Sequence, residues 1–257
     1  MRSDCWSKES MPDVFTPLSQ VQFVEQLVCD RYRVKIPKFL AEAHQWWPTW
    51  EKERFASMEK ELRQGDVLFD IGAETGWQSA IYAQFVGAKN MVLIEPTAQN
   101  WPAIKATWEA NGLENPKSTA IGFLSDRDEH GELFIGEHRG WIKEAYAEEL
   151  LTNTKFSHID ENGGTIGQAT LDRFVEMSSI CPNAITIDVE GFELAVLCGA
   201  KGILQFVRPL VWVSLHEGLT RPGVNPKNED VINFMAKQGY DGIKLGVDHE
   251  AHWIFRP

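Results

Sequence analysis

Two carboxylates and a glycine follow one another in the stretch Asp188-Val189-Glu190-Gly191, which ends the apolar run from Ala184. Side chains alternate along an extended segment, so we expect Asp188 and Glu190 to point the same way. Two such carboxylates can take a proton from a hydroxyl group. Alternatively, they can bind a divalent cation that acidifies the hydroxyl. A neighbouring apolar run ends at His216, whose imidazole is the best single candidate for a general base near neutral pH. We therefore predict Asp188, Glu190 and His216 as the catalytic residues.

Structural roles are the alternative for the same residues. Gly191 opens the next helix, so Glu190 or Glu193 could simply stabilise the positive end of the helix dipole. His216 could be an ordinary hydrogen-bonded polar residue. For Asp172, in the sequence TLDRF, we favour a structural role, as a helix cap or a link between loops, over a catalytic one.

A second candidate site lies in the sequence VLFDIGAETG, residues 67–76. An apolar run ends at Asp70, and Gly72 and Gly76 then allow a tight turn into a helix with free N–H groups at its start. The loop lacks the third glycine of G-x-G-x-x-G, and Asp70 and Glu74 would repel a diphosphate. The loop therefore favours the cationic sulfonium of S-adenosylmethionine over a nicotinamide cofactor. The alternative is a plain structural turn.

Polar residues also end the next two predicted strands. Glu95 closes the run MVLIE, where an acidic side chain typically accepts hydrogen bonds from ribose hydroxyls. Ser125 and Asp126 close the run AIGFLSD, where they could meet the amino group of adenine. Together with the loop, these residues predict a nucleoside site.

These residues must be positioned by alternating strands and helices, which indicates a doubly wound parallel sheet. The final pair of strands, joined by a turn at 246–250, predicts an antiparallel hairpin at the sheet edge. The predicted strands are 67–71, 91–95, 119–124, 184–189, 210–216, 242–245 and 252–255, with a further short one at 132–136, and the predicted helices are 78–86, 101–111, 193–206 and 228–238.

Two regions of different character indicate the domain organisation. Residues 1–63 have a polar, helical pattern, including Val21, Val24, Leu27 and Val28 at helical spacing, and predict a helical N-terminal extension. Residues 64–257 are predicted to form the cofactor-binding domain. Trp141–Gly164 lacks clear periodicity and is predicted to be a loop or lid.

Composition restricts the classes of partner. The 257 residues carry a net charge of −12, with 43% hydrophobic and 24% charged residues, so we expect an ordinary globular protein without extended nucleic-acid binding. Four scattered cysteines form no C-x-x-C pair, which argues against zinc and favours a reducing compartment. With no apolar membrane-spanning run and no signal peptide, we predict a cytoplasmic protein; its oligomeric state is open.

The quoted motifs resemble those of FkbM-type methyltransferases over roughly residues 65–257. They come in the family's order: GDVLFDIGAETG, LIEP, GFLSD, TLDRF, ITIDVEGFELAVLCGA and RPLVWVSLHE, of which IDVEGFE is the most specific. The resemblance implies a class I methyltransferase (Rossmann-like) fold and methylation of hydroxyl groups, often on sugars or secondary metabolites. It also implies S-adenosylmethionine binding by Asp70, Gly72, Ala73, Gly76 and Glu95.

Two positions depart from the family pattern. Glu74 stands where the family loop usually has Asn, and Ser214 stands where many members have Glu. They motivate an alternative, a Rossmann-like binding module with altered catalysis; a nicotinamide-dependent oxidoreductase is a weaker one. The cluster Trp46, Trp47 and Trp50 is predicted to anchor the extension to the core, or else to form a stacking surface for substrate.

Overall fold

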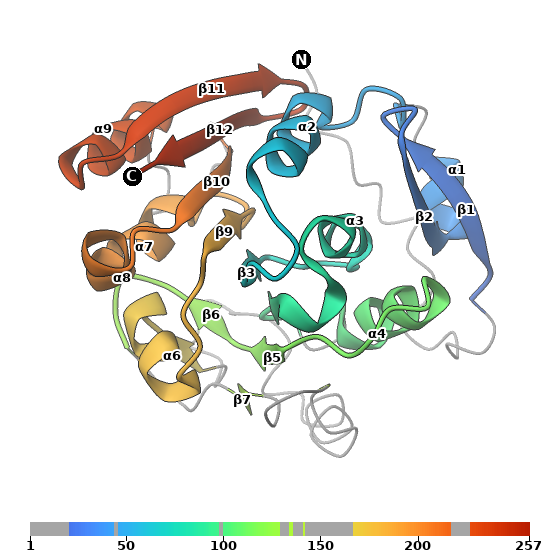
Figure 1. The fold of residues 1–257 in the computed structure, drawn as a ribbon, viewed down its shortest axis with the longest axis horizontal. Helices are drawn as coiled ribbons and strands as arrows, with labels where there is room; N and C mark the ends of the chain where they lie inside the picture. The colour runs from blue at the N-terminus through green and yellow to red at the C-terminus, as the bar shows by residue number, and fades with distance from the viewer. Residues whose placement is uncertain are drawn as a thin grey trace, which may run out of the picture.

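The computed structural model describes residues 21–43, 46–97, 100–128, 134–135, 141, 167–216 and 227–257 (Figure 1). The predicted loop Trp141–Gly164 lies outside this part of the chain except for Trp141, which packs edge-on against Trp108. The strands are β1 (Phe23–Val28), β2 (Tyr32–Pro37), β3 (Leu68–Ile71), β4 (Met91–Ile94), β5 (Ser118–Ile121), β6 (Phe123–Leu124), β7 (Phe134–Ile135), β8 (Gln168–Ala169), β9 (Ala184–Ile187), β10 (Leu210–Leu215), β11 (Asp241–Val247) and β12 (Ala251–Arg256). The helices are α1 (Lys38–Ala43), α2 (Lys52–Glu61), α3 (Trp77–Val86), α4 (Trp101–Ala110), α6 (Leu171–Ser178), α7 (Glu193–Cys198), α8 (Lys201–Phe206) and α9 (Asn228–Lys237), with a short 3-10 turn η2 (Ala88–Asn90).

The main sheet has the strand order β11-β12-β10-β9-β3-β4-β5-β7. Strands β10, β9, β3, β4 and β5 pair in parallel, whereas β12 pairs antiparallel with both β10 and β11. The predicted doubly wound sheet with an antiparallel C-terminal hairpin is thus confirmed. The strand order reverses direction at β3, and open α/β sheets bind ligands at such a switch point.

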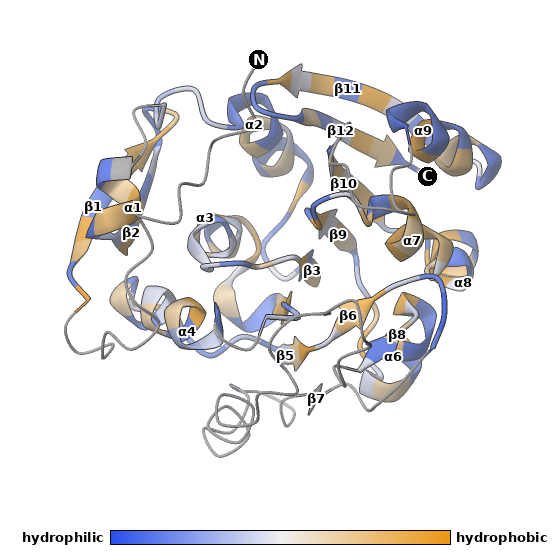
Figure 2. Cartoon of the chain, turned by 180° about the vertical axis from the view of Figure 1, so that it is seen from behind, coloured by the Kyte–Doolittle hydropathy of each residue, from blue (hydrophilic) through white to orange (hydrophobic). Residues whose placement is uncertain are grey.

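Each central strand contributes alternate residues to two hydrophobic cores, as its two-residue repeat requires. In β3, Leu68 faces the core that contains α2, α3 and α4, whereas Phe69 and Ile71 face the core that contains α6 to α9. The outer helix α9 is both hydrophilic and hydrophobic along its length, which suits a helix with one face on the sheet (Figure 2).

The N-terminal extension is not purely helical. Residues 23–37 form the antiparallel hairpin β1–β2, so the helical interpretation of Val24, Leu27 and Val28 is wrong. In β2 the buried side chains of Val34 and Ile36 are two residues apart, which is strand rather than helix spacing. The hairpin contacts α3 and α4, while α2 lies beside the β11–β12 hairpin (Figure 1).

Two further differences come from glycines. The predicted helix 193–206 is divided into α7 and α8 at Gly199, where a Cβ would lie 1.9 Å from the carbonyl oxygen of Ser125. Such a close approach of backbone leaves no room for a side chain. The predicted strand 119–124 is likewise interrupted at Gly122, which has a φ of 154°, and continues as β6 paired with β8.

Asp172 has the structural role that we favoured for it. Its carboxylate accepts hydrogen bonds from the backbone N–H groups of Gly202 and Ile203, at 2.7 and 2.9 Å, and so caps the start of α8. Thr170 caps α6, a helix that the sequence analysis did not delimit. Within the described residues, every helix is too short or too polar to cross a bilayer.

Candidate active site

The loop after β3 is fixed to both neighbouring strands. The N–H groups of Gly72 and Ala73 both donate to the carbonyl oxygen of Ile94, at 2.9 and 3.2 Å. A Cβ on Gly72 would lie 1.8 Å from the carbonyl oxygen of Asp188, and the φ of Gly72 is 94°. Only glycine permits this close approach of backbone, which holds the ends of β3, β4 and β9 together at the switch point.

A cavity of about 460 Å³ opens at this edge of the sheet. Its size is within the range of sites for nucleoside-sized ligands. It is lined by the β3 loop, the ends of β4, β5 and β9, part of the N-terminal extension and the turn between β11 and β12. The lining residues with carboxylates are Glu51, Glu74, Glu95, Asp188, Glu190 and Glu250, and those with aromatic side chains include Trp46, Trp47, Trp50, Trp77, Phe123, Phe192 and His249.

Glu95 lies in the cavity wall, as the ribose hypothesis requires. Its carboxylate accepts hydrogen bonds from the backbone N–H groups of Glu74, at 3.0 Å, and Thr97, at 2.8 Å, and from the side-chain amide of Asn100. These bonds fix the orientation of the carboxylate: Oε1 accepts from Thr97 and Asn100, whereas Oε2 accepts only from Glu74 and keeps a further lone pair. A buried, oriented acceptor of this kind suits a ribose hydroxyl.

Glu74 also lines the cavity, in a left-handed conformation with a φ of 47°. Burial, followed by the charge of Glu95, raises the pKa of Glu74 to about 7. Because an added positive charge would favour the ionised form, this position suits a cationic ligand.

Three other predicted cofactor residues shape the loop without lining the cavity. Asp70 is buried and accepts a short hydrogen bond from the hydroxyl of Ser79, and burial raises its pKa to about 6. Ala73 is buried, and Gly76 has a φ of 77° at the start of α3.

Ser125 and Asp126 are not among the residues that line the cavity, and their contact with adenine stays a prediction. The wall here consists of Gly122, Phe123 and Leu124. The break at Gly122 directs the chain to β8, where the N–H of Ser125 donates to the carbonyl oxygen of Ala169 at 2.9 Å. The prediction of one straight strand over residues 119–124 does not include this change of direction.

The three predicted catalytic residues do come together. Candidate ligand atoms of Asp188, Glu190 and His216 all lie within 4.8 Å of one another. The reason differs from the one expected, because β9 ends at Ile187 and Glu190 is left-handed with a φ of 52°. A turn, rather than strand alternation, therefore brings the two carboxylates to one place.

His216 is held by carboxylates at both ring nitrogens. Nδ1 lies 2.8 Å from Glu193, and Nε2 contacts Glu250 directly. Burial acts to lower its pKa, but the interactions with Glu193 and Glu250 outweigh it and raise the pKa to about 11. An imidazolium has no lone pair for a proton, so in this arrangement His216 supplies positive charge rather than acting as the free base that we predicted.

The pKa of Asp188 is also raised, but for a carboxylate this has the opposite consequence for proton acceptance. Burial and the charge of Glu250 raise its pKa well above the ordinary value. A carboxylate with a raised pKa is a better proton acceptor than an ordinary one. Of the predicted catalytic residues, Asp188 is therefore the better candidate for a base.

The turn between β11 and β12 adds residues that the sequence analysis missed. Glu250 and His249 both line the cavity, and Asp248 accepts the backbone N–H of Glu51 at 2.8 Å. Burial acts to raise the pKa of Glu250, yet its ion pairs with His216 and His249 hold it below the ordinary range. The density of ionisable residues in DHEAH, residues 248–252, was the available signal.

Arg54 on α2 is the other missed residue. It is fully buried, and its guanidinium donates to Glu51 at 2.6 Å, to Ser214 at 2.9 Å and, through a short bond, to Thr186. It also forms an ion pair with Asp188 at 3.4 Å. The extension thus supplies the cation beneath the carboxylate cluster, and Ser214, the departure from the family pattern, is one of its acceptors.

The chain's sequence matches the model of the FkbM methyltransferase domain over residues 70–241. The chain belongs to this family. The match spans the β3 loop, Glu95 and the Asp188–Glu190 turn. The matched region therefore includes the part of the cavity wall that the strand ends form. The expected class I methyltransferase fold is confirmed.

One solved structure agrees at the level of the fold, and two others are less similar. An FkbM methyltransferase from Methylobacillus flagellatus KT has a TM-score of 0.51 and 15% identity; the alignment covers 76% of this chain and 45% of the other. This chain therefore spans less than half the length of that relative. Precorrin-6y C5,15-methyltransferase from Geobacter metallireducens GS-15 has a TM-score of 0.47 and 11% identity, over 80% and 88% of the two chains. TYW2 from M. jannaschii, solved with AdoMet, has a TM-score of 0.43 and 13% identity, over 87% and 82%. No curated protein matches in sequence.

Proposed function

We propose that this FkbM-family chain transfers a methyl group from S-adenosylmethionine to a hydroxyl group of a small molecule or glycan. The observation that carries the proposal is the carboxylate-rich cavity at the switch point, with Glu95 on one side and the Asp188–Glu190 turn on the other. A nucleoside with a positive charge at its far end matches both features.

Four residues fit the cofactor. Glu95 presents an oriented carboxylate for ribose hydroxyls. Glu74, with its pKa near neutral, favours a positive charge beside it. Gly72 leaves the loop free of a side chain. Thr75 lines the cavity, and its buried hydroxyl has no hydrogen-bond partner among the described residues.

When bound, S-adenosylmethionine supplies a methyl group on a cationic sulfur. The remaining task for the protein is to orient the acceptor and take its proton. We assign proton acceptance to Asp188, with Glu190 beside it as a second carboxylate at the cavity wall. His216 holds Glu193 and Glu250 in place, so that the carboxylates do not repel one another apart.

The aromatic wall points to the acceptor class. Trp46 and Trp50 are stacked with ring centroids 6.3 Å apart, and both line the cavity together with Trp47. Flat aromatic faces pack well against sugar and aromatic rings. Trp47 is also buried against Trp77, so the cluster both anchors the extension and offers a surface for a substrate ring.

Calorimetry tests cofactor choice. We expect S-adenosylmethionine and its demethylated product to bind, and NAD not to bind. Glu95→Gln should weaken binding about tenfold, because a neutral amide replaces a charged acceptor, whereas Glu109→Gln on the exposed side of α4 should not. Binding of NAD in place of S-adenosylmethionine would overturn the proposal.

Transfer of a labelled methyl group tests the reaction. Incubation with pools of glycans and small alcohols should label an oxygen atom, and Asp188→Asn should lower kcat with little effect on cofactor affinity. The alternative, a binding module with altered catalysis, is motivated by the ion-paired state of His216. Cofactor binding without label transfer to any pool would favour that alternative.

A further inference from the structure

Three carboxylates surround one nitrogen atom of His216. Its Nε2 lies 3.6 Å from Asp188 and 3.7 Å from Glu190, and it contacts Glu250 directly. Ligand atoms bound about 2.0–2.2 Å from a common ion lie roughly 2.8–3.6 Å apart. The two carboxylates therefore lie close to coordination spacing from Nε2, and the ligand atoms of Asp188, Glu190 and His216 all lie within 4.8 Å of one another.

The other nitrogen of His216 is held in the manner of a metal ligand. Nδ1 lies 2.8 Å from the buried carboxylate of Glu193, which is itself fixed by the N–H of Gly191 at 2.9 Å. Ligating histidines commonly donate their second ring N–H to a carboxylate, which fixes the tautomer and orients the ring. Nε2 is then the nitrogen left to bind a cation, and it lies among Glu250, Asp188 and Glu190.

Glu250 provides an independent indication of a missing cation. Its side chain is only 3% exposed, and neither carboxylate oxygen has a hydrogen-bond donor in bonding geometry. Among the described residues, its charge is balanced by ion pairs with histidines only: His216, His249 and, at 4.0 Å, His252. A buried carboxylate without hydrogen bonds is costly, and a divalent cation at the adjoining cluster would compensate its charge.

We propose that Asp188, Glu190 and His216 bind one divalent transition-metal cation, with Glu193 as a positioning residue and Glu250 supplying further negative charge. Two carboxylates and one imidazole suit Mn²⁺ or Zn²⁺ better than Ca²⁺ or Mg²⁺, because imidazole is a poor ligand for the latter two. The existence of the site is independent of the proposed function. Its role rests on that function: Asp188 and Glu190 line the cavity, so the cation would withdraw charge from an acceptor hydroxyl.

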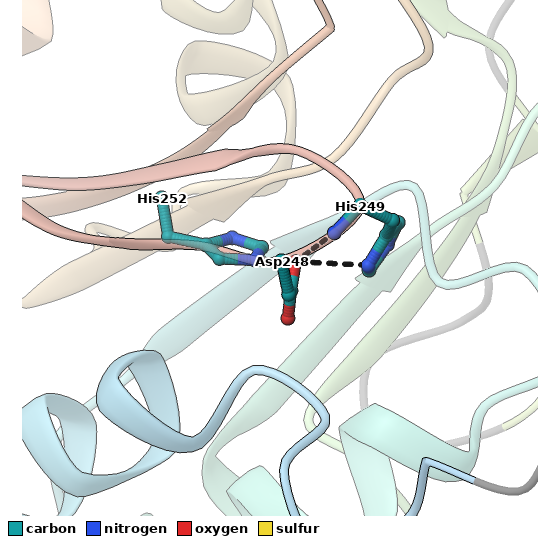
Figure 3. A group of neighbouring side chains, drawn as sticks. All are labelled: Asp248, His249 and His252. Carbon is teal, nitrogen blue, oxygen red and sulfur yellow. Dashed lines mark hydrogen bonds and ion pairs between the residues drawn. The ribbon is translucent and has the colours of Figure 1, made fainter. Parts of the chain in front are cut away.

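A neighbouring group, Asp248, His249 and His252, is a weaker candidate (Figure 3). The carboxylate of Asp248 lies 2.9 Å from a ring nitrogen of each histidine, and its second oxygen accepts the N–H of Glu51. The remaining nitrogen of His252 lies 3.1 Å from the hydroxyl of Ser214. A cation here would have to displace the contacts of Asp248 with both histidines, whereas at His216 it replaces only the Nε2 contact with Glu250 and leaves Nδ1 on Glu193.

Titration of the purified chain with Mn²⁺, followed by the electron paramagnetic resonance signal of the free ion, tests the site. We expect one bound ion per chain, and competition by Zn²⁺. Glu190→Gln should weaken Mn²⁺ binding at least about tenfold. Its side chain is 64% exposed, so the change should not disturb folding. The matched control is Glu109→Gln, also 64% exposed, which should leave binding unchanged.

Two further variants make the result decisive. His216→Gln, with its fold checked by circular dichroism, should abolish binding, whereas His249→Gln should change the affinity by less than about threefold. Absence of Mn²⁺ binding, or wild-type affinity in Glu190→Gln, or loss confined to His249→Gln, would overturn the inference. S-adenosylmethionine affinity is measured on the same samples: a chain that binds cofactor but no Mn²⁺ refutes only the metal site, and the converse refutes only the proposed function.

Discussion

One wall of the cavity consists of strand ends and the loop after β3, whereas another consists of residues 46–51 and the turn between β11 and β12. The first wall is built from local patterns: an apolar run, then an acidic residue or a glycine. The second depends on contacts between residues far apart in the chain, such as Glu51 and Asp248. The family pattern thus specifies the wall that we propose for the nucleoside, while long-range packing specifies the wall opposite it.

The largest effect should come from the link between the two walls. Arg54→Met removes the buried cation that contacts Glu51, Asp188 and Ser214. Leaving buried carboxylates unpaired should lower the free energy of unfolding by about 3–5 kcal/mol. Urea denaturation measures it. Arg31→Met is the control, because Arg31 pairs with Glu59 at the surface, with its side chain 64% exposed, and should cost below about 1 kcal/mol. Similar losses in both variants would contradict the buried link.

A smaller but still large effect is expected within the first wall. Gly72→Ala places a Cβ against the carbonyl oxygen of Asp188. It should lower the free energy of unfolding by about 3 kcal/mol and abolish cofactor binding. Gly65 has a similar φ, 98°, but nothing within 4 Å of a Cβ, so Gly65→Ala should cost only about 1 kcal/mol, from backbone strain. Thermal unfolding of the two variants separates the steric clash at Gly72 from backbone strain. Equal losses of stability would show that the close approach of Gly72 to Asp188 is unimportant.

The ionisation of Glu74, in the first wall, should make the free energy of unfolding depend on pH. The folded pKa of Glu74, about 7, is above its ordinary value of 4.5, so between these values the folded chain holds a proton that the unfolded chain has released. This group makes the free energy of unfolding fall as pH rises from 4.5 to 7, and it has no further effect above that window.

Glu74→Gln should therefore gain stability relative to the wild type as pH rises from 4.5 to 8. Urea denaturation at several pH values measures the difference. Glu109→Gln should instead shift the curve uniformly. If Glu74→Gln tracked the wild type at every pH, the environment assigned to Glu74 would be wrong.

The smallest stability effect should come from the second wall. Trp46 is 54% exposed, so Trp46→Ala should change the free energy of unfolding by less than about 0.5 kcal/mol. If its ring stacks on the acceptor, KM for the acceptor should rise while cofactor affinity stays constant. An unchanged KM would leave Trp46 out of the acceptor site.

The sequence predicted the sheet because its strands are short apolar runs, each ending in a polar residue or glycine, as at Asp70 and Glu95. It failed for β1 and β2, where the branched residues of a half-buried hairpin also fit a helical repeat. It failed for the course of residues 119–124, because the turn at Gly122 depends on pairing with β8. The role of Arg54 could not be predicted for a different reason. An arginine in a polar helix is typical of a surface residue, and its acceptors come from distant parts of the chain.

The hydrogen bond from Glu51 to Asp248 joins residues that are 197 positions apart in the chain. The turn that carries Asp248 belongs to the hairpin β11–β12, whose second strand lies between β10 and β11. The last strand of the chain is therefore both an inner strand of the sheet and a support of the aromatic wall. A truncation that removed it would alter the cavity as well as the sheet.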